Sequence, residues 1–323
     1  MKTVLPHRYE DIISVENILE AWQEFLRGKR NKPDVQIFSL RLMDNIFNLY
    51  YELSNYIYKH GGYQQFKIND PKPRIVHKAS VRDRLLHHAV HRKLYPFFDK
   101  KFIADSYSCR NNRGTHKALN QFRKYCRNIS KNNTRQCWIL KCDIKKFFVS
   151  IDQQMLVEIL QKHILDKNIV GLLREIIISF GPKGLPLGNL TSQLFANVYL
   201  NEFDYFVKHK LKIRYYIRYA DDFIILADNK KYLVKLLPKI REFLAKELKL
   251  LLNEQKVFIK TYASGIDFLG WIHFPYHRQI RTATKRRMIK RLHGCSKRET
   301  IIAYQGLLGH GNAYKLRKDL NLC

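Results

Sequence analysis

The chain is short of negative charge. Only 28 Asp and Glu residues stand against 59 Lys and Arg residues, which leaves a formal net charge of +31 over 323 residues. Such a balance is typical of proteins that bind polyanions, although ribosomal and membrane-surface proteins share it. Because hydrophobic residues make up 46% of the chain, disorder is not expected, and the length permits a substantial core and more than one domain.

Several other features are missing. No run approaches the roughly 18 apolar residues of a membrane span, and residues 1–7 lack the apolar centre of a signal peptide. Six cysteines, at positions 109, 126, 137, 142, 295 and 323, include no Cys-x-x-Cys pair, which argues against a zinc site. We therefore expect reduced thiols in a cytoplasmic protein that has no membrane partner.

Two of the scarce acids are adjacent, in Tyr219-Ala220-Asp221-Asp222. The runs 213–218 and 223–226 on either side are apolar and β-prone, so the pattern predicts a β-hairpin with two carboxylates at its tip. In so basic a chain, this acidic point suits a divalent cation, whose further ligand would be a phosphate. A solvated Asp-Asp turn is the ordinary alternative for an isolated pair.

A third acid favours the cation site. Asp143 closes the apolar run 137–142, and a carboxylate at a strand end is available to a site. Mg²⁺ is usually held by one or two carboxylates plus substrate phosphates, and two such ions can clamp an in-line displacement at phosphorus. Asp143 and the Asp221-Asp222 pair are far apart in sequence, so they can meet only through tertiary structure.

With these motifs in this order, the chain resembles a reverse transcriptase from about Pro71 to Gly270. The Tyr-Ala-Asp-Asp box is typical of that superfamily. Within it, the segment 184–197 most resembles the enzymes of diversity-generating retroelements. Group II intron enzymes carry a Gln-Gly step and end the motif in Ser-Pro, whereas this chain has Leu187-Gly188 and Ser192-Gln193.

Apolar spacing predicts helices over 12–26, 40–58, 82–98, 191–208 and 230–250, a helix capped by Asp152, a basic helix over 278–298, and strands at 74–76 and about Gly265 and Gly270. Mixed helices and short antiparallel strands indicate an α+β fold. The resemblance implies a right-hand polymerase fold. Its parts would be an N-terminal helical region over 1–70, fingers over 71–135, palm over 136–154 and 183–276, a fingers/palm insertion over 155–182, and a thumb over 277–323.

The resemblance also implies roles at the acidic site. Asp143 and Asp221 would bridge two Mg²⁺ ions, for which Mn²⁺ could substitute, with Ile144 as a further ligand and Asp222 supporting the site at longer range. Lys256 matches a lysine near the leaving pyrophosphate. It is either a general acid or a surface lysine after a turn.

Phe148, five positions after Asp143, matches an aromatic that lies under the sugar and excludes ribonucleotides. The alternative is a core Phe at a strand end. If this segment is a strand, Phe147 points to the other face. The arginines that could grip the triphosphate through their planar fork of donors are Arg74, Arg110 and Arg113. Asp83-Arg84 matches a family dipeptide, or is an ion pair on a helix surface.

Leu187 and Gly188 are expected to line the nascent base pair, where glycine permits close backbone approach. Leu187 replaces a Gln common in accurate relatives. Because buried polar contacts discriminate better than apolar ones, the pocket should tolerate mispairs, and the resemblance implies that it does so mainly opposite template adenines.

Two segments resemble contacts to the primer and template. Residues Phe268, Leu269 and Gly270 match the hairpin that holds the primer end. Lys285, Arg286, Lys290 and Arg291 belong to a basic segment that extends to Arg298 and resembles a thumb helix. Cations there would bind the duplex backbone without reading its sequence.

The resemblance implies an RNA-directed DNA polymerase of a bacterium or phage. It would copy a template-repeat RNA into mutated cDNA, binding template RNA, the cDNA/RNA heteroduplex and dNTP. No ribonuclease H, maturase or endonuclease region is evident, so a small basic oligomeric accessory protein is expected as a partner. A group II intron or retron enzyme is one alternative. A catalytically silent RNA-binding protein is another, against which the intact Asp143, Asp221 and Asp222 argue.

Overall fold

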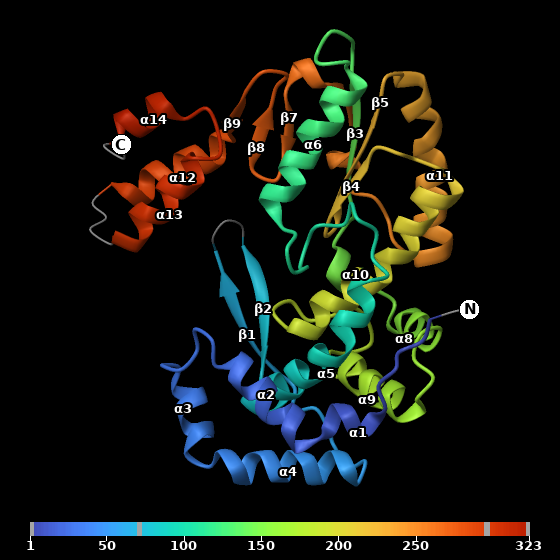
Figure 1. Ribbon diagram of the computed structural model, residues 1–323, viewed down its shortest axis with the longest axis vertical. Coiled ribbons are helices and arrows are strands. Elements are labelled where there is room, and N and C mark those ends of the chain that lie inside the picture. Colours follow the sequence, from blue (N-terminus) through green and yellow to red (C-terminus); the bar gives the residue numbers. More distant parts are fainter. Residues whose placement is uncertain (1–2, 70–72, 294–297, 321–323) are drawn as a thin grey trace. The chain divides into compact units, whose positions relative to one another are not determined.

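The computed structural model describes residues 3–69, 73–293 and 298–320 (Figure 1). The chain forms two compact units, each discontinuous in sequence. The first unit comprises residues up to 110 together with 144–212 and 241–252, and the second comprises 111–143, 213–240 and the residues from 253 onward. The predicted boundary between residues 70 and 71 lies outside the described residues. The predicted limits of fingers, palm and thumb remain a prediction.

The first unit is mostly helical. Its helices are α1 (Tyr9–Ile13), α2 (Val15–Phe25), α3 (Pro33–Leu40), α4 (Leu42–Ser54), α5 (Val81–Asp99), α7 (Phe147–Ser150), α8 (Gln153–Gln161), α9 (Lys167–Ile178) and α10 (Leu190–Tyr205), the last continued by a π-helix (Phe206–Lys210). Helix α5 packs against α2 and α10. Its inner face includes Leu85, Leu86 and Ala89, all fully buried, which confirms the helix predicted over 82–98. An antiparallel hairpin, β1 (Tyr63–Ile68) and β2 (Arg74–Ala79), precedes α5.

Two predicted N-terminal helices have different limits in the structure. The helix expected over 12–26 is divided into α1 and α2 at Ser14, whose hydroxyl accepts a hydrogen bond from the Asn17 amide at 3.2 Å and so begins α2. The helix expected over 40–58 ends at Ser54, because Tyr56 adopts a φ of 57°, in the left-handed region that ends helices. Asp152 begins α8 as predicted, since its carboxylate accepts from the Met155 amide at 2.9 Å.

The second unit is built on a four-stranded antiparallel sheet. Its strands are β3 (Trp138–Asp143), β4 (Tyr216–Tyr219), β5 (Asp222–Ala227) and β6 (Phe258–Thr261), in the order β4-β5-β3-β6. Helix α6 (Thr115–Ile129) contacts β4 and β5. Helix α11 (Lys230–Leu248) follows β5 and continues into the residues of the first unit.

A second, three-stranded sheet lies beside α6 (Figure 1). Its strands are β7 (Ile266–Phe268), β8 (Trp271–His273) and β9 (Arg278–Ile280). The Phe122 ring of α6 lies 5.6 Å from the Phe268 ring and 5.0 Å from the His273 ring, between ring centroids. These aromatic contacts bury one face of α6 and hold the small sheet against it.

The C-terminal helices are α12 (Thr282–Leu292), α13 (Arg298–Leu308) and α14 (Tyr314–Asp319). They pack around buried Met288, Leu308 and Ala313. A single basic helix was predicted over 278–298, and both of its predicted ends are wrong. Residues 278–280 form β9, and α12 ends at Leu292. Part of that prediction, including Lys297, lies outside the described residues.

The mixture of helices with antiparallel sheets confirms the α+β prediction. The cysteines at 109, 126, 137 and 142 are free thiols, as expected, and positions 295 and 323 fall outside the described residues. None of the described helices combines the length and the apolar character that a membrane crossing requires.

Candidate active site

The acidic pair lies at the tip of a hairpin in the second unit, as predicted. Tyr219 pairs with Asp222 across β4 and β5, which leaves Ala220 and Asp221 as a two-residue turn. Ala220 adopts a φ of 53°. Arg218 is fully buried below the turn, and its guanidinium donates to the Ala220 carbonyl at 3.2 Å. Arg218 was not among the predicted site residues. Its hydrogen bond stabilises the turn that carries Asp221.

The sheet brings the third carboxylate to the same place. Asp143 is the last residue of β3, and β3 pairs with β5 so that Asp143 lies directly opposite Asp222. Residues opposite each other in an antiparallel pair have Cα atoms roughly 4.5–5.5 Å apart. The meeting of Asp143 with Asp222 and the neighbouring Asp221, which the sequence could only suggest, is therefore confirmed.

The three carboxylates repel one another in a partly dehydrated setting. Burial raises the pKa of Asp221 to about 6, and the charges of Asp143 and Asp222 add to that rise. Burial also raises the pKa of Asp222, with Asp143 contributing in the same direction and Lys141 opposing it. Groups shifted in this way favour a nearby cation, which would relieve the repulsion.

Two lysines already lie against these acids. The Lys256 Nζ atom is 2.6 Å from Asp143 Oδ2. The Lys141 Nζ atom is 3.8 Å from Asp222 Oδ1 and donates to the Asp267 carbonyl at 3.0 Å. Lys256 was a candidate from the sequence, and Lys141 was missed. Lys141 could have been predicted to lie near the site, because it precedes Asp143 by two residues and alternate residues of a strand share a face.

Asn253 is a further neighbour that the sequence did not reveal. Its amide donates to the Asp143 carbonyl at 2.8 Å, and its side-chain amide donates to Asp143 Oδ2 at 3.4 Å. Both bonds hold the end of β3 in place. Nothing in the local pattern around Asn253 predicts this contact, since it depends on how the segment after α11 returns to the sheet.

The three carboxylates are ligands of the type that a divalent cation prefers, but their side chains are not in a coordinating arrangement. Within residues 3–69, 73–293 and 298–320, no group of three or more His, Cys, Asp or Glu side chains is placed ready to hold a metal ion. Asp143 is turned to Lys256 instead. The chemistry nevertheless fits, because Asp143, Asp221 and Asp222 supply oxygen ligands from adjacent strand ends. The hydrocarbon side chain of Ile144 has no metal ligand, so only its backbone carbonyl could take part.

Phe148 lies in the first unit, on the one-turn helix α7 and not on a strand. Successive helical residues are rotated by about 100°, so Phe147 and Phe148 still point in different directions, but for a different reason than predicted. Phe147 is 3% exposed, whereas Phe148 is only partly buried. The Phe148 carbonyl accepts from the Leu185 amide at 2.8 Å, which ties α7 to the loop that carries Leu187.

That loop runs against strand β2. The Leu187 carbonyl accepts from the His77 amide at 2.8 Å. Gly188 has a φ of 115°, and a Cβ atom there would lie 2.7 Å from a methyl carbon of Val76. A side chain at Gly188 would therefore clash with β2, and this packing alone explains why glycine occupies the position. The predicted contact of Leu187 and Gly188 with a base pair remains a prediction.

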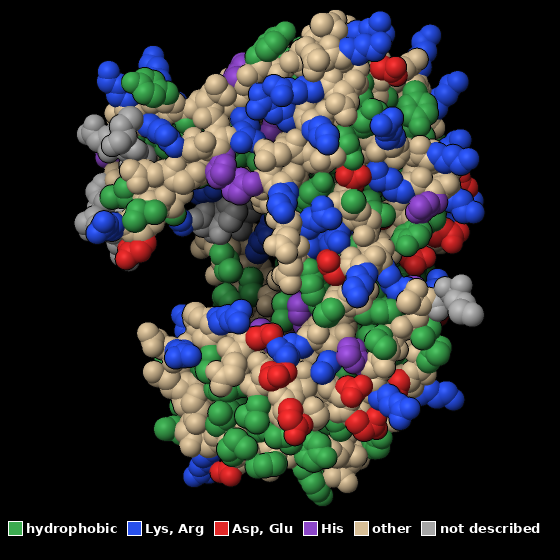
Figure 2. Space-filling model, viewed as in Figure 1, with side chains coloured by type: hydrophobic (Ala, Val, Ile, Leu, Met, Phe, Trp, Pro, Cys, Tyr) green, Lys and Arg blue, Asp and Glu red, His purple; other side chains and the backbone are tan. Residues whose placement is uncertain are grey.

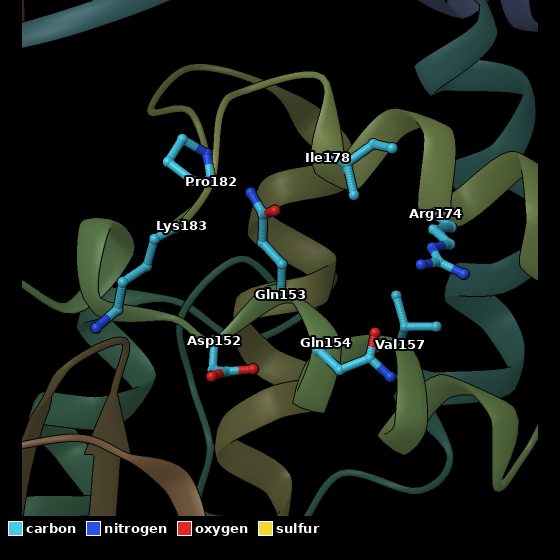
Figure 3. Close-up of a pocket in the computed structure, with 8 residues that line it drawn as sticks. All are labelled: Asp152, Gln153, Gln154, Val157, Arg174, Ile178, Pro182 and Lys183. Carbon is cyan, nitrogen blue, oxygen red and sulfur yellow. The ribbon is translucent and has the colours of Figure 1, made fainter.

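Gln153 fixes the start of the same loop. Its side-chain amide donates to the Gly184 carbonyl at 2.9 Å and to the Ile177 carbonyl at 3.1 Å. Gln153 also lines a pocket of about 280 Å³. Figure 3 shows other residues that line it, among them Asp152, Arg174 and Lys183. No predicted site residue is among the described residues that line this pocket, so we regard it as part of the support for the loop.

Two of the three candidate arginines are accessible, and one is not. Arg74 opens β2 and Arg113 precedes α6, both with exposed side chains. The Arg110 side chain is only 4% exposed, and its Nε donates to the Asp99 carboxylate at 2.7 Å. The remaining guanidinium nitrogens bond the backbone carbonyls of Asp99, Ile103 and Ser106. Arg110 therefore holds the end of α5 in place, and its guanidinium is not available to a triphosphate as predicted.

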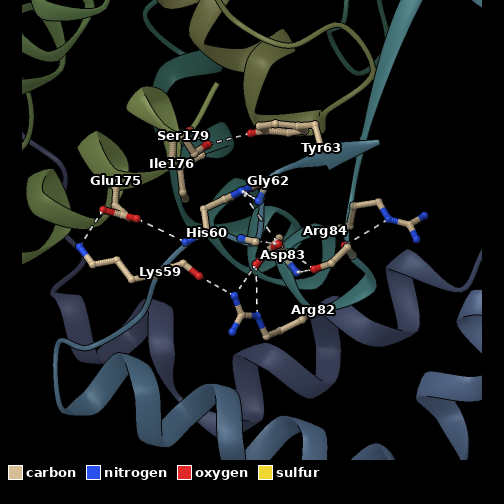
Figure 4. Close-up of polar contacts among 12 residues, drawn as sticks. Lys59, His60, Gly62, Tyr63, Arg82, Asp83, Arg84, Glu175, Ile176 and Ser179 are labelled. Atoms are coloured by element: carbon tan, nitrogen blue, oxygen red, sulfur yellow. Dashed lines mark hydrogen bonds and ion pairs between the residues drawn. The ribbon is translucent and has the colours of Figure 1, made fainter. Parts of the chain in front are cut away.

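The dipeptide Asp83-Arg84 is not an ion pair on a helix surface. Asp83 is fully buried and accepts hydrogen bonds from the Tyr58 hydroxyl at 2.8 Å and the Gly61 amide at 3.0 Å. Its ion-pair partner is Arg82, at 3.1 Å (Figure 4). Arg84 pairs with Asp34. Asp83 thus joins the start of α5 to the segment that leads into the β1–β2 hairpin.

A hairpin is present at residues 266–273, as expected, and the four basic residues lie on helix α12. Leu269 (φ 49°) and Gly270 (φ 88°) form a two-residue turn after Phe268, between β7 and β8. Two positive φ values are typical of the turn that suits tight hairpins. On α12, the four basic residues are exposed while Met288 faces the core: Lys285, Arg286, Lys290 and Arg291. Contacts of either segment with nucleic acid remain a prediction.

Comparison with known proteins gives consistent results. The family model described as reverse transcriptase (RNA-dependent DNA polymerase) matches residues 59–273. The chain is 26% identical to Protein YkfC of Escherichia coli (strain K12), over 64% of the chain and 63% of that protein. It is 23% identical to the group II intron-encoded protein LtrA of Lactococcus lactis subsp. cremoris, over 64% of the chain and 45% of that protein. The chain thus spans less than two thirds of these relatives.

The fold is also similar to a solved structure. Apo telomerase from Candida tropicalis superimposes with a TM-score of 0.55 at 13% sequence identity, over 82% of this chain and 57% of that one. At this identity the likeness concerns the fold alone, and it supports the right-hand polymerase architecture expected from the sequence.

Proposed function

The chain belongs to the reverse transcriptase (RNA-dependent DNA polymerase) family, and from this premise we propose that it copies RNA into DNA at Asp143, Asp221 and Asp222. The observation that carries the proposal is the pairing of Asp143 with Asp222 at the ends of β3 and β5, beside the Asp221 turn. Intact carboxylates at this point argue against a silent homologue. The direct test is extension of a DNA primer on an RNA template by the wild type and by a variant that lacks the acidic pair.

In the proposed reaction a primer 3′-hydroxyl attacks the α-phosphate of a deoxynucleoside triphosphate, and pyrophosphate leaves. Two divalent cations, Mg²⁺ in the first instance, would neutralise phosphate charge and lower the pKa of the attacking hydroxyl. Asp143 and Asp221 would hold them, with Asp222 in support. Lys256 lies 2.6 Å from Asp143, so its ammonium balances that carboxylate in the free protein. Once cations take the place of this ion pair, Lys256 would act as the acid toward the leaving pyrophosphate.

We propose that Arg74, Arg113 and Phe148 would bind and orient the nucleotide. Arg74 and Arg113 have exposed guanidinium groups suited to phosphate oxygens. Phe148 would exclude a 2′-hydroxyl. We assign the sheet that carries the carboxylates to the palm and the helices α12–α14 to the thumb, which would contact the cDNA/RNA heteroduplex.

We expect RNA binding to weaken steeply with salt, because the chain carries a net charge of +31. The logarithm of affinity should fall linearly with the logarithm of salt concentration, with a slope of about −0.7 for each phosphate neutralised on a single strand. The Lys285→Gln/Lys290→Gln variant, altered on exposed positions of α12, should reduce that slope by about 1.4. Fluorescence anisotropy of a labelled RNA over a salt series measures it.

A matched control removes the same charge elsewhere. Lys235 and Lys239 are exposed on α11, and the Lys235→Gln/Lys239→Gln variant should keep the wild-type slope. A flat salt response of the wild type would mean that the basic surface serves another partner. An equal loss of slope in both variants would remove α12 from the proposed interface.

A narrower candidate function is error-prone copying of a template-repeat RNA, as in diversity-generating retroelements. It is supported by the Leu187-Gly188 step and the Ser192-Gln193 ending, where group II intron enzymes carry Gln-Gly and Ser-Pro. A small basic oligomeric accessory protein would then be the expected partner. Two near-identical DNA repeats beside the gene, differing mainly at adenines, would support this function, and a small structured RNA encoded there would favour a retron enzyme.

Leu187→Gln should lower misincorporation opposite template adenine by about fivefold, the effect of one net hydrogen bond. Leu187 is only partly buried, in a loop held by its own carbonyl to His77, so a polar side chain can be accommodated there at some cost in rate. Sequencing of cDNA from one RNA template measures the error at each base. Accurate copying of adenine by the wild type would contradict the diversity-generating function, whereas an error rate unchanged by the substitution would contradict only the role of Leu187.

A further inference from the structure

A cavity of about 210 Å³ lies within the second unit, and none of the three carboxylates is among the described residues that line it. Its walls come from α6, from the turn between β8 and β9, and from the residues between α13 and α14. They include Arg123, Arg278, His273, His277 and Tyr276. Figure 2 shows His side chains beside Lys and Arg side chains over the region of α6 and β9.

The cavity holds positive charge without a matching acid. Arg123 comes from α6 and Arg278 from β9, and no Asp or Glu is found among the described lining residues. Burial lowers the pKa of Arg278, and the neighbouring charge of Arg123 lowers it further. Two guanidinium groups that line one cavity repel each other, and an anion bound between them would offset that repulsion.

Arg278 is fixed in position by its surroundings. Its Nε atom donates to the His310 carbonyl, and its guanidinium carbon lies 5.3 Å from the centre of the Trp271 ring. A guanidinium oriented by one backbone bond and one aromatic face keeps other N–H groups for a ligand. Planar guanidinium donors match the oxygens of a phosphate group.

His273 provides a second, independent observation. It is 2% exposed, and its Nε2 atom is buried without a hydrogen-bond partner in the part of the chain that the structure describes. Burial lowers the pKa of His273 to about 4, with Arg278 adding to the effect. Buried polar atoms are nearly always paired, so this nitrogen indicates a missing partner. An imidazole nitrogen that carries a proton can donate a hydrogen bond to a phosphate oxygen.

The rim of the cavity offers aromatic faces. The Phe274 and His277 rings are stacked, with centroids 4.7 Å apart and an angle of 16° between planes. Tyr276 is 77% exposed. Nucleic-acid bases stack on such faces with little dependence on base identity.

We propose that this cavity is a nucleotide site, separate from the polymerisation site, that binds a phosphate group between Arg123 and Arg278. His273 hydrogen-bonds the phosphate, and Tyr276 stacks on the attached base. The phosphate comes either from a free nucleotide or from a nucleic-acid strand, since both present anionic phosphate oxygens to the guanidinium groups. The proposal does not depend on catalysis, because its residues are distinct from the carboxylates.

The test is calorimetric titration of the full chain with adenosine 5′-monophosphate, inorganic phosphate and adenosine, with EDTA present to suppress metal-dependent nucleotide binding. We expect the two phosphates to bind and adenosine to bind at least about tenfold more weakly, as loss of a charged hydrogen-bonding group predicts. Arg123→Gln should weaken binding of the monophosphate by about tenfold for the same reason. Arg123 is exposed on α6, so the substitution should leave the fold intact.

Lys124→Gln is the matched control. Lys124 is the next residue of α6, is exposed, and is not among the residues that line the cavity, so the change removes the same charge and should leave binding within about twofold of the wild type. Any of three results would overturn the proposal. These are equal losses of affinity in the two variants, equal binding of adenosine and its monophosphate, or no binding by the wild type. Synthesis of cDNA by the variants does not bear on it.

An RNA oligonucleotide without a terminal phosphate identifies the source of the ligand. Displacement of the monophosphate by this RNA, lost in Arg123→Gln and retained in Lys124→Gln, would assign the site to backbone phosphates. Binding of the monophosphate that the RNA does not displace would assign it to a free nucleotide.

Discussion

The Asp221→Asn/Asp222→Asn variant is expected to bind RNA normally and to make cDNA about a thousandfold more slowly than the wild type. Asn keeps the size of each side chain and suits the turn between β4 and β5, so the hairpin should persist. The substitutions remove two negative charges from a cluster whose repulsion raises the pKa of Asp221 to about 6. Loss of the carboxylate ligands should cost several kcal/mol of transition-state stabilisation, or about a thousandfold in rate.

Primer extension on a defined RNA template measures the loss, and RNA binding and thermal unfolding of the same variant show whether it is folded. Asp228→Asn is the matched control. Asp228 is exposed and directly follows β5, at the other end of the strand from Asp222, so it removes a charge from the same strand without touching the site. Undiminished synthesis by the double variant would refute the catalytic assignment.

The acidic hairpin could be predicted because its signals are local. Alternating and apolar residues on both sides of Asp221 and Asp222 define two strands, and a two-residue turn between them needs no distant information. The cross-strand pairing of Asp143 with Asp222, in contrast, could not be predicted from local signals. It depends on the register of β3 against β5, which the hydrophobic pattern restricts and the packing of the whole sheet decides.

Arginine roles could not be predicted from motif position alone. Arg110 and Arg113 are three residues apart, yet the first is enclosed by Asp99 and backbone carbonyls while the second is exposed. The same limit applies to Asp83, whose partners Tyr58 and Gly61 lie in a preceding segment. In a chain with 59 basic residues, only the tertiary environment separates a structural arginine from an accessible one.

Among the elements that were not predicted, helix α6 has a clear signal in the sequence, and strand β1 has none. Helix α6 buries Ala118, Leu119, Phe122 and Cys126, which is the spacing of an amphipathic helix. Strand β1 is exposed at nearly every position, so it shows no alternation of apolar and polar residues. It exists because β2 pairs with it.

Phe148→Ala is expected to raise the acceptance of ribonucleotides relative to deoxynucleotides by about 10- to 200-fold, the discrimination that one steric contact in an apolar pocket can provide. The two neighbouring rings differ in a way that supports this role. Phe147 is 3% exposed and belongs to the core, whereas Phe148 is only partly buried. The bond from the Leu185 amide to the Phe148 carbonyl fixes the backbone of α7 against the loop of Leu187, so the ring is held by a rigid support.

The measurement is the ratio of kcat/KM for a ribonucleotide and its deoxynucleotide in single-nucleotide extension on one RNA template. Val149→Ala is the control, because Val149 is the next residue of α7 and is 49% exposed, and its ratio should equal that of the wild type. Removing a ring that only filled the core would lower stability and affect both nucleotides alike. An unchanged ratio in Phe148→Ala would therefore assign Phe148 to packing, and a changed ratio with unchanged thermal unfolding would assign it to recognition of the sugar.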